Sequence, residues 1–237
     1  MSQESKLAII LPIYNPPENW ENKLIYSLNE LEKELNSMNY FLVIVNDGST
    51  KQMDDEKIKR IQEHHKNVLY HTYPENKGKG YAVRYGLNET AADFYIYTDF
   101  DFPFGYHAIK QTFEILLQSG VNLVIGKRGI EYFSILPFKR RLISKGLRSI
   151  NYLISGFRII DTQAGLKGLD NRAKAEFQTT KINSFIFELE FLLKCLRNKL
   201  SYKFIEVIPR EDIAFSDFGI KTIRKELANF VKVLSNS

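Results

Sequence analysis

Short apolar runs alternate with helix-like segments along the first 128 residues of the chain. The apolar runs are rich in Ile, Leu and Val and are bounded by Asn, Asp and Gly, which is typical of buried strands. Between these runs, apolar residues recur every three or four positions, as on one face of a helix. The predicted strands are 7–12, 41–45, 68–71, 94–97 and 123–126, and the predicted helices are 19–36, 53–65, 81–91 and 106–118.

This alternation predicts an α/β fold, in which helices flank a Rossmann-like, mostly parallel sheet. In such sheets, ligands bind beyond the carboxyl ends of the strands. Three polar groups directly follow predicted strands, namely Asn46-Asp47, Asp99 to Asp101 and Lys127-Arg128. We therefore expect these three groups to converge on one crevice.

The second half of the chain carries basic amphipathic segments. Residues 137–160 contain six Lys or Arg, including Arg140 and Arg141, and no Asp or Glu. Such a segment suits a helix at an anionic membrane interface or around an acceptor phosphate. It equally suits a helix that packs on the domain with a solvated basic face. A helix over 185–196, a strand over 202–208 and a basic amphipathic helix over 221–234 are also predicted.

Composition excludes several classes of protein. The chain has 237 residues, of which 44% are hydrophobic and 26% charged, as in ordinary globular proteins. Cys195 is the only cysteine, which excludes a disulfide scaffold and zinc sites built on several cysteines. The net charge of +5 allows an anionic ligand or membrane surface. Because neither a transmembrane run nor a signal peptide is evident, we expect a cytoplasmic protein.

Asp99 and Asp101 are the most informative pair in the sequence. If the strand continued through them, both carboxylates would point the same way and could hold one Mg²⁺ or Mn²⁺ that bridges a diphosphate. The alternative is a strand end with solvated acids. Asp47 could accept hydrogen bonds from a base or ribose, or form a simple turn with Gly48. The basic, glycine-rich segment 76–80 precedes a helix whose N-terminus could face phosphate.

The order of these motifs resembles that of family 2 glycosyltransferases with the GT-A fold. The chain contains, in order, Leu-Pro-Ile-Tyr-Asn, Asn-Asp-Gly-Ser-Thr, Asn-Lys-Gly-Lys-Gly, Asp-Phe-Asp, Ile-Gly-Lys-Arg and Asp-Thr-Gln-Ala-Gly. Over about residues 6–212, it is most similar to the dolichyl-phosphate mannosyltransferase and polyprenyl-phosphate glycosyltransferase group. The resemblance implies a single GT-A domain over 1–237, with a nucleotide-sugar-binding half (1–128) and an acceptor-binding half (129–237).

The resemblance also implies roles for the matching residues of the donor side. The implied donor-binding residues are Pro12, Tyr14, Asn15, Asp47, Gly78, Lys79 and Asp99. Asp99 and Asp101 would hold the metal, and Arg128 would meet phosphate. Two positions depart from the family pattern. Asn46 replaces the first acid of Asp-Asp-Gly-Ser, and Pro103 stands where the polyprenyl-phosphate group usually has a metal-ligating glutamine.

On the acceptor side, the resemblance implies contacts from two motifs. The residues concerned are Asp161, Thr162 and Gln163 of Asp-Thr-Gln-Ala-Gly, and Glu188 and Glu190, which match a Phe-Asp-x-Glu motif in the following helix. Arg140 and Arg141 of the basic segment would add positive charge there. Asp101, Arg128 and Asp161 are the residues that we expect to act in catalysis.

The resemblance implies an inverting, metal-dependent transfer of a hexose from a GDP-mannose or UDP-glucose type of donor. The acceptor would be a polyprenyl or dolichyl phosphate at the membrane surface. A metal at Asp101 and the charge of Arg128 would neutralise the departing diphosphate. A phosphate acceptor is already anionic and needs no strong base, whereas a saccharide hydroxyl would need one, for which Asp161 is the candidate.

Three other functions stay open. A saccharide acceptor would place the enzyme in cell-surface polysaccharide synthesis. A nucleotidyltransferase also joins a parallel sheet to metal-binding carboxylates, but its glycine-rich N-terminal signature is missing. A catalytically inert nucleotide-binding module is the last option. We expect peripheral contact with the inner face of the membrane and no nucleic-acid partner.

Overall fold

A computed structural model describes the chain at residues 5–36, 38–118, 120–129, 152, 164–184 and 186–210. Its elements, in chain order, are β1 (Leu7–Ile13), α1 (Trp20–Glu34), β2 (Tyr40–Asn46), α2 (Asp55–His64), β3 (Val68–Thr72), α3 (Lys79–Asn88), β4 (Phe94–Thr98), α4 (Gly105–Leu116), β5 (Leu123–Arg128), β6 (Leu166–Asp170), α7 (Asn171–Gln178), α8 (Phe187–Arg197) and β7 (Tyr202–Val207).

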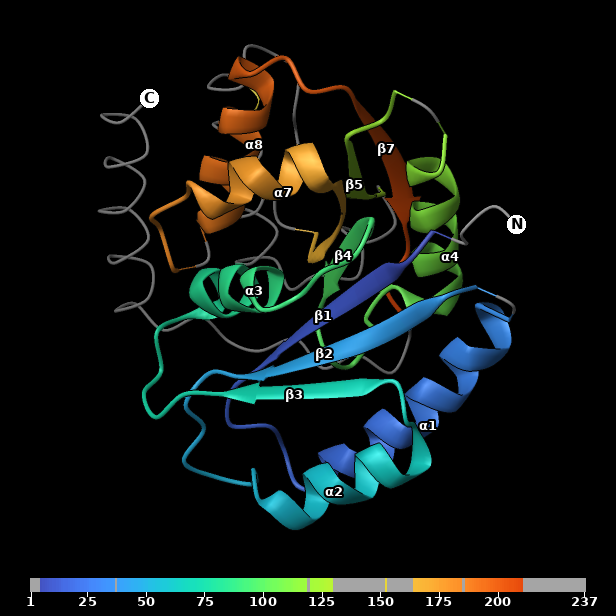
Figure 1. Ribbon diagram of the computed structural model, residues 1–237, viewed down its shortest axis with the longest axis vertical. Helices are drawn as coiled ribbons and strands as arrows, with labels where there is room; N and C mark the ends of the chain where they lie inside the picture. Colours follow the sequence, from blue (N-terminus) through green and yellow to red (C-terminus); the bar gives the residue numbers. More distant parts are fainter. Residues whose placement is uncertain are drawn as a thin grey trace.

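The seven described strands form one sheet, in the order β3-β2-β1-β4-β6-β5-β7 (Figure 1). β1 pairs in parallel with β2 and β4, β2 pairs in parallel with β3, and β5 pairs in parallel with β7. β6 runs antiparallel to both of its neighbours, β4 and β5. The predicted α/β class with a mostly parallel sheet is confirmed, and one antiparallel strand is added to it.

The apolar pattern predicts every described element of the first 128 residues but neither β6 nor α7. β6 has the sequence Leu-Lys-Gly-Leu-Asp, in which Lys167 and Gly168 interrupt the apolar run. The strand is nevertheless buried, because the charge of Lys167 is neutralised inside the protein by Glu188, 3.0 Å away. A partner so distant in sequence leaves no periodic signal, so the pattern misses the strand.

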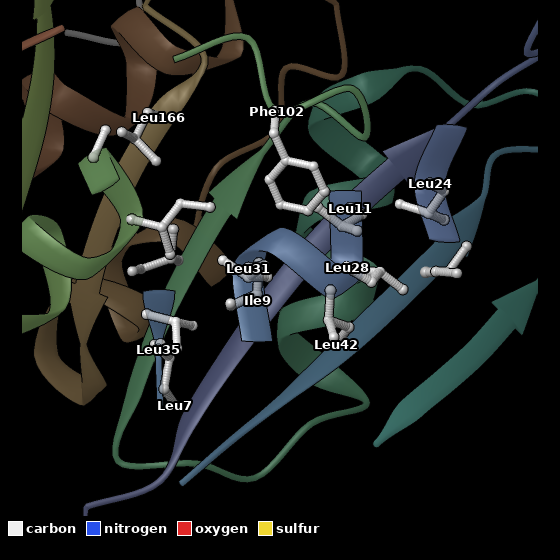
Figure 2. Packing of buried hydrophobic residues seen from close by; sticks show 14 of the residues in the cluster. Leu7, Ile9, Leu11, Leu24, Leu28, Leu31, Leu35, Leu42, Phe102 and Leu166 are labelled. Atoms are coloured by element: carbon white, nitrogen blue, oxygen red, sulfur yellow. The ribbon is translucent and has the colours of Figure 1, made fainter. Parts of the chain in front are cut away.

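Apolar side chains cover both faces of the sheet. On one face, Leu7, Ile9 and Leu11 of β1 pack against leucines of α1 and against residues of α2 and α4 (Figure 2). On the other face, Ala8 and Ile10 pack with residues of α3, α7 and α8. Successive strand residues point to opposite faces, so a strand that is buried on both faces is apolar throughout. Each fully buried Leu or Ile contributes about 1.5–3 kcal/mol to this core.

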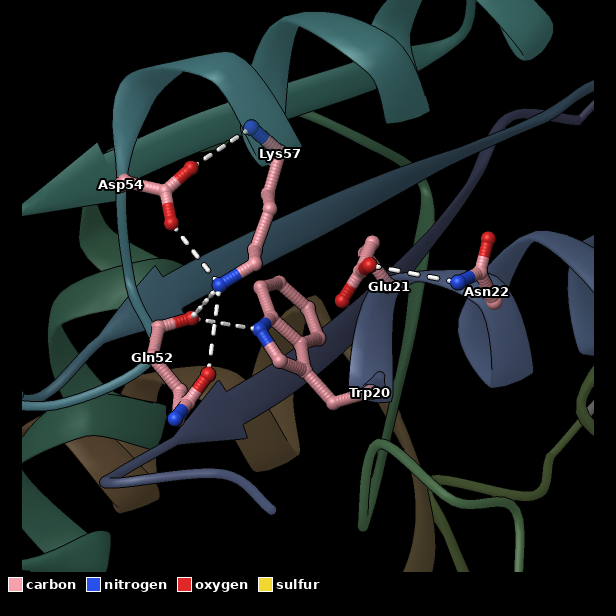
Figure 3. Close-up of polar contacts among 6 residues, drawn as sticks. All are labelled: Trp20, Glu21, Asn22, Gln52, Asp54 and Lys57. Carbon is pink, nitrogen blue, oxygen red and sulfur yellow. Dashed lines mark hydrogen bonds and ion pairs between the residues drawn. The ribbon is translucent and has the colours of Figure 1, made fainter. Parts of the chain in front are cut away.

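The loop between β2 and α2 is fastened to α1 by polar contacts (Figure 3). Nε1 of the buried Trp20 donates to the main-chain oxygen of Gln52 at 2.7 Å, and Nζ of Lys57 donates to the same oxygen at 3.3 Å. Asp54 caps α2 by accepting a hydrogen bond from the Lys57 N–H at 2.9 Å. This loop begins at Asp47, so the contacts fix the chain that follows one of the predicted site residues.

The described helices are short. α1 has 15 residues, whereas a helix needs about 20 apolar residues to cross a bilayer. Over the described ranges, no helix combines the length and the apolar character that crossing a membrane requires. The predicted basic helices, 137–160 and 221–234, lie in parts of the chain that the structure does not describe, apart from Tyr152.

Candidate functional site

The polar groups that follow the strands meet at one edge of the sheet. β2 and β4 both flank β1 in parallel, so Asp47 and Asp99 emerge at the same edge. β4 and β5 both run antiparallel to β6, so they point in the same direction. Arg128, at the end of β5, therefore also lies at this edge. Because β6 is reversed, its first residue lies beside Thr98, the last residue of β4. The expected convergence at the carboxyl edge therefore follows from the strand order.

The loop after β1 joins the loop after β2 through Asn15. Its side-chain oxygen accepts hydrogen bonds from the Thr50 N–H at 2.9 Å and the Lys51 N–H at 3.2 Å. Asn15 has φ 43°, in the left-handed region that asparagine tolerates better than most residues. Pro12 lies within β1, and Tyr14 is 50% exposed beyond its end. The contact of these two residues with a nucleotide base stays a prediction.

Asn46 connects β2 to β3 at the same edge. Its Nδ2 donates to Oγ1 of Thr72 at 3.0 Å and to the hydroxyl of Tyr70 at 3.2 Å, while its Oδ1 accepts from the Ser49 N–H at 2.9 Å. Each hydroxyl can act as donor or acceptor, so an aspartate here could accept from the same groups. The side chain of Asn46 thus joins the ends of β2 and β3 to the start of the following loop.

Asp47 is buried, with 2% of its surface exposed, and its carboxylate is fully hydrogen-bonded. Oδ1 accepts from the hydroxyl of Tyr73 and the Lys77 N–H, both at 2.8 Å. Oδ2 accepts from Nδ2 of Asn76 at 2.8 Å and the Gly78 N–H at 2.9 Å. The carboxylate therefore folds segment 73–78 over the end of β2. Its predicted contact with a nucleotide base stays a prediction.

Asp99 and Asp101 lie in a turn and not in a strand. β4 ends at Thr98, and the Phe102 N–H donates to the Asp99 carbonyl at 3.0 Å, which closes the turn. The premise that a continued strand aligns the two carboxylates is therefore wrong. Phe102 has φ 48°, a conformation that costs an ordinary residue about 1–3 kcal/mol. Its buried ring, 5.6 Å from the ring of Tyr106, holds the turn in place.

Lys79, the first residue of α3, pairs with this turn. Its Nζ lies 2.5 Å from Oδ1 of Asp99, and 23% of the Lys79 side chain and 40% of the Asp99 side chain are exposed. Burial alone would lower the pKa of Lys79, but the carboxylates of Asp99 and Glu188 outweigh it and raise the pKa. The lysine therefore keeps its positive charge beside the two acids.

Gly165 lies against the Lys79–Asp99 pair, at the start of the chain that enters β6. A Cβ atom at this position would come within 2.7 Å of Oδ2 of Asp99 and 3.4 Å of Nζ of Lys79. The last glycine of the Asp-Thr-Gln-Ala-Gly motif thus leaves room for the ion pair. The role of this glycine was not predicted from the sequence, although the motif contained it.

Asp101 belongs to the exposed side of the turn. Partial burial and the neighbouring Asp99 carboxylate raise its pKa, and the charges of Lys79 and Arg210 oppose this shift. The Arg210 N–H donates to the Pro103 carbonyl at 2.8 Å, and its Nη1 donates to the hydroxyl of Tyr106 at 3.2 Å. Arg210 was not identified as a site residue from the sequence. The rule that ligands bind beyond the carboxyl ends of parallel strands could have found it, because Arg210 follows the end of β7.

The turn fits a divalent cation that takes only part of its ligands from the protein. Asp99 and Asp101 offer carboxylate oxygens, and no group of three or more His, Cys, Asp or Glu side chains placed to hold a metal gathers among the described residues. Mg²⁺ and Mn²⁺ accept such sites, because water and substrate phosphates complete their coordination. Bringing two like charges together in one turn also favours a bound cation.

Glu188 is placed in the interior, where it pairs with Lys167. Lys167 is 0% exposed and Glu188 is 4% exposed, and Nζ of Lys167 also donates to the Ala164 carbonyl at 2.5 Å. Tyr97 lies next to Lys167 in the register of β4 and β6. Burial and the Glu188 carboxylate raise the pKa of Tyr97 well above its ordinary value. In this structure, Glu188 neutralises a buried lysine in the interior, and its contact with the acceptor stays a prediction.

The other predicted residues are placed as follows. The carboxylate of Glu190 accepts hydrogen bonds from the Lys181 and Ile182 N–H groups. Arg128 is the last residue of β5 and is paired in register with Val207. The remaining predicted residues lie outside the described ranges, namely Arg140, Arg141, Asp161, Thr162 and Gln163.

Comparison with known families identifies the family of the chain. Residues 8–173, more than half of the chain, match the model of Glycosyl transferase family 2. The chain belongs to this family. The resemblance inferred from the order of the motifs is therefore confirmed, and this family 2 protein is a glycosyltransferase.

Several curated relatives of this family 2 protein are dolichyl-phosphate beta-glucosyltransferases. The chain is 24% identical to one from Trichomonas vaginalis, over 96% of this chain and 72% of that protein. It is 25% identical to the mouse enzyme, over 83% of this chain and 65% of the enzyme, so it spans less than two thirds of that relative. A UDP-N-acetylglucosamine--dolichyl-phosphate N-acetylglucosaminyltransferase of Methanococcus voltae is 26% identical, over 82% of each chain.

Solved structures confirm the fold expected for this family 2 protein. Glucosyl-3-phosphoglycerate synthase of Mycobacterium tuberculosis, crystallised with Mn²⁺, UDP and glucosyl-3-phosphoglycerate, has a TM-score of 0.66 and 15% identity, over 97% of this chain and 80% of that one. A Pyrobaculum calidifontis mannosyltransferase in complex with GDP-Man and Mn²⁺ has a TM-score of 0.64 and 13% identity, over 96% of this chain and 62% of that one. At these identities, the likeness shows the GT-A fold.

Proposed function

We propose that the protein transfers a hexose from a nucleoside diphosphate sugar to a polyprenyl or dolichyl phosphate, with inversion at the anomeric carbon and with Mg²⁺ or Mn²⁺. The observation that carries this proposal is the Asp99–Asp101 turn, backed by Lys79 at the carboxyl edge of the sheet. The relatives named as dolichyl-phosphate glucosyltransferases support a lipid phosphate acceptor and the transfer of glucose, for which a UDP-glucose type of donor is our first candidate. A GDP-mannose type of donor is the other candidate.

The reaction requires the site to hold a diphosphate while it departs. Asp101 and Asp99 would hold the divalent cation, which supplies charge neutralisation to the leaving diphosphate. Lys79 forms an ion pair with Asp99, and Arg128 provides positive charge from the end of β5. These fixed charges would stabilise the transition state because they need no rearrangement as the negative charge develops.

The acceptor phosphate carries its own nucleophile. One of its anionic oxygens forms a bond to the anomeric carbon while the bond from that carbon to the diphosphate oxygen breaks. The nucleoside diphosphate leaves with the electron pair, and the single displacement inverts the centre. Because the attacking oxygen is already ionised, no general base is needed.

A saccharide hydroxyl acceptor is the alternative. It would need a base, for which Asp161 is our candidate, as in cell-surface polysaccharide synthesis. The lipid phosphate comes first because several relatives are named for dolichyl phosphate. With such an acceptor, we propose that the protein works peripherally at the inner face of the membrane and that Arg140 and Arg141 contact the acceptor phosphate.

Thermal unfolding with nucleotides tests the proposal directly. A ligand that binds only the folded state stabilises it by RT ln(1 + [L]/Kd), which is about 2.7 kcal/mol at a hundredfold excess over Kd. We expect a Mn²⁺-dependent rise in Tm with UDP or GDP, and the nucleotide that acts identifies the donor class. The absence of a shift with both nucleotides would contradict the proposed site. Turnover with dolichyl phosphate against an oligosaccharide then separates the two acceptors.

A further inference from the structure

A short segment from the second half of the chain lies against the glycine-rich turn that carries Lys79. Residues 180–183 follow α7 and precede α8, and they run past the N-terminus of α3 (Figure 1). The Gly80 N–H donates to the Asn183 carbonyl at 2.9 Å, which joins the segment to α3 directly. What fixes this segment therefore also fixes the turn.

The contact leaves no free space between the two pieces of chain. A Cβ atom on Gly78 would come within 2.5 Å of the Asn183 carbonyl oxygen, and one on Gly80 within 2.7 Å of the Ile182 carbonyl oxygen. Lys79 stands between these two glycines. Its backbone therefore rests on segment 180–183, while its Nζ reaches Asp99.

Arg84 holds the segment from the side of α3. Its Nη1 and Nη2 both donate to Oδ1 of Asn183, at 3.1 and 3.0 Å, and its Nε donates to the Thr180 carbonyl at 3.3 Å. The planar guanidinium thus binds both ends of the segment at once. A lysine could not reproduce this fork of donors.

Glu190 holds the same segment from the side of α8. Its two carboxylate oxygens both accept from the Lys181 N–H at 3.0 Å, and Oε2 also accepts from the Ile182 N–H at 2.8 Å. Hydrogen bonds to a charged acceptor are about twice as strong as those between neutral groups. Both oxygens of Glu190 are therefore engaged in fixing the backbone of segment 180–183.

We propose that Arg84 and Glu190 are positioning residues for the binding of the donor diphosphate. They fix segment 180–183, this segment fixes the 78–80 turn, and the turn holds the Lys79 ammonium on Asp99 beside Asp101. The inference rests on the proposed function and deepens it. It also assigns Glu190 to the donor side, whereas the family resemblance implied an acceptor contact.

Isothermal titration of the purified full-length protein with UDP or GDP in the presence of Mn²⁺ tests this inference. The variants are Glu190→Ala, Glu190→Gln, Arg84→Met and Arg84→Lys, each checked for its Tm before titration. We expect the Kd of the nucleotide to rise about tenfold in Glu190→Ala and Arg84→Met. Glu190→Gln keeps one acceptor oxygen, so a smaller rise, about threefold, is expected; Arg84→Lys should stay near the Arg84→Met value.

Two matched controls change the same charges elsewhere. Glu89→Ala alters an exposed glutamate at the end of α3, and Arg197→Met alters an exposed arginine at the end of α8. Neither residue contacts segment 180–183 in the described structure, so both variants should bind the nucleotide like the wild type. Steady-state kinetics complete the test, since a positioning role on the donor side raises KM for the nucleotide sugar and leaves KM for dolichyl phosphate unchanged.

The outcomes separate this inference from the proposed function. A wild-type protein that binds neither UDP nor GDP with Mn²⁺ overturns the proposed function. A wild type that binds, together with folded Glu190→Gln and Arg84→Lys variants of unchanged Kd, overturns the inference alone. A rise in KM for dolichyl phosphate with an unchanged KM for the nucleotide sugar would also overturn it and return Glu190 to the acceptor side.

Discussion

Two loops at the same edge of the sheet use their carboxylates in opposite ways. After β2, Asp47 is buried and its oxygens accept four hydrogen bonds from segment 73–78. After β4, Asp99 and Asp101 share a turn in which Lys79 is the cation paired with Asp99. When protein donors occupy all the lone pairs of a carboxylate, as at Asp47, the carboxylate fixes the conformation of the chain. A carboxylate with few protein donors keeps lone pairs for a ligand.

Glu188 extends the comparison into the interior. It lies in α8, behind the Asp99 turn, and forms an ion pair with the buried Lys167. Like Asp47, Glu188 stabilises the fold. Its ion-pair partner is a charged lysine, whereas Asp47 accepts hydrogen bonds from uncharged groups. Substitutions in the Asp99–Asp101 turn, at Asp47 and at the Lys167–Glu188 pair should therefore separate effects on turnover from effects on stability.

The largest effect is expected from Asp101→Asn. The substitution should abolish turnover, a loss of at least about 10³-fold or about 4 kcal/mol, because an uncharged amide is a poor ligand for Mg²⁺ or Mn²⁺. The free energy of unfolding should hardly change, since Asp101 is exposed and shares its turn with another acid. Release of nucleoside diphosphate measures the turnover. Unchanged turnover would contradict the metal assignment.

Lys167→Met should lower the free energy of unfolding by about 3–5 kcal/mol, because it leaves the Glu188 carboxylate buried without its partner. The double variant Lys167→Met/Glu188→Leu removes both charges and should recover most of the loss. Urea unfolding followed by circular dichroism measures both. If the double variant were as unstable as the single one, the ion pair would not be the cause.

Asp47→Asn should lower the free energy of unfolding by about 2–3 kcal/mol. The amide keeps one acceptor oxygen but points an NH₂ group at two of the four donors. Asp55→Asn, an exposed position in α2, is the control and should stay within about 0.5 kcal/mol of the wild type. A variant of unchanged stability but weaker nucleotide binding would show that Asp47 acts on the base and not on segment 73–78.

Gly165→Ala should have the smallest effect, a rise of about tenfold in the Kd for nucleotide and Mn²⁺, equal to about 1.4 kcal/mol. The new Cβ displaces the Asp99 carboxylate, which is partly exposed and can move, so stability should change little. Titration calorimetry measures the Kd. In a Lys79→Met background, the same substitution should add little, because residues that act through one contact are not additive.

The fold of the first half could be predicted because its strands are buried on both faces and carry continuous apolar runs. The convergence of Asp47 and Asp99 on one edge could be predicted because the carboxyl ends of parallel strands lie at the same edge of a sheet. β6 could not be predicted, since Lys167 is stable in the core only through Glu188, which lies in a later helix. The contacts of Glu190 with segment 180–183 depend on how α8 packs, and no local pattern records that.

The reversed strand β6 has a consequence for the order in which the protein can be made. It enters the sheet between β4 and β5, although both precede it in the chain. On the ribosome, β4 and β5 therefore emerge with unpaired backbone groups that invite pairing with other chains. Contacts over such sequence distances slow folding. A nascent chain that has reached residue 128 still lacks Gly165 and segment 180–183, so its donor edge is completed only after residue 183 has been added.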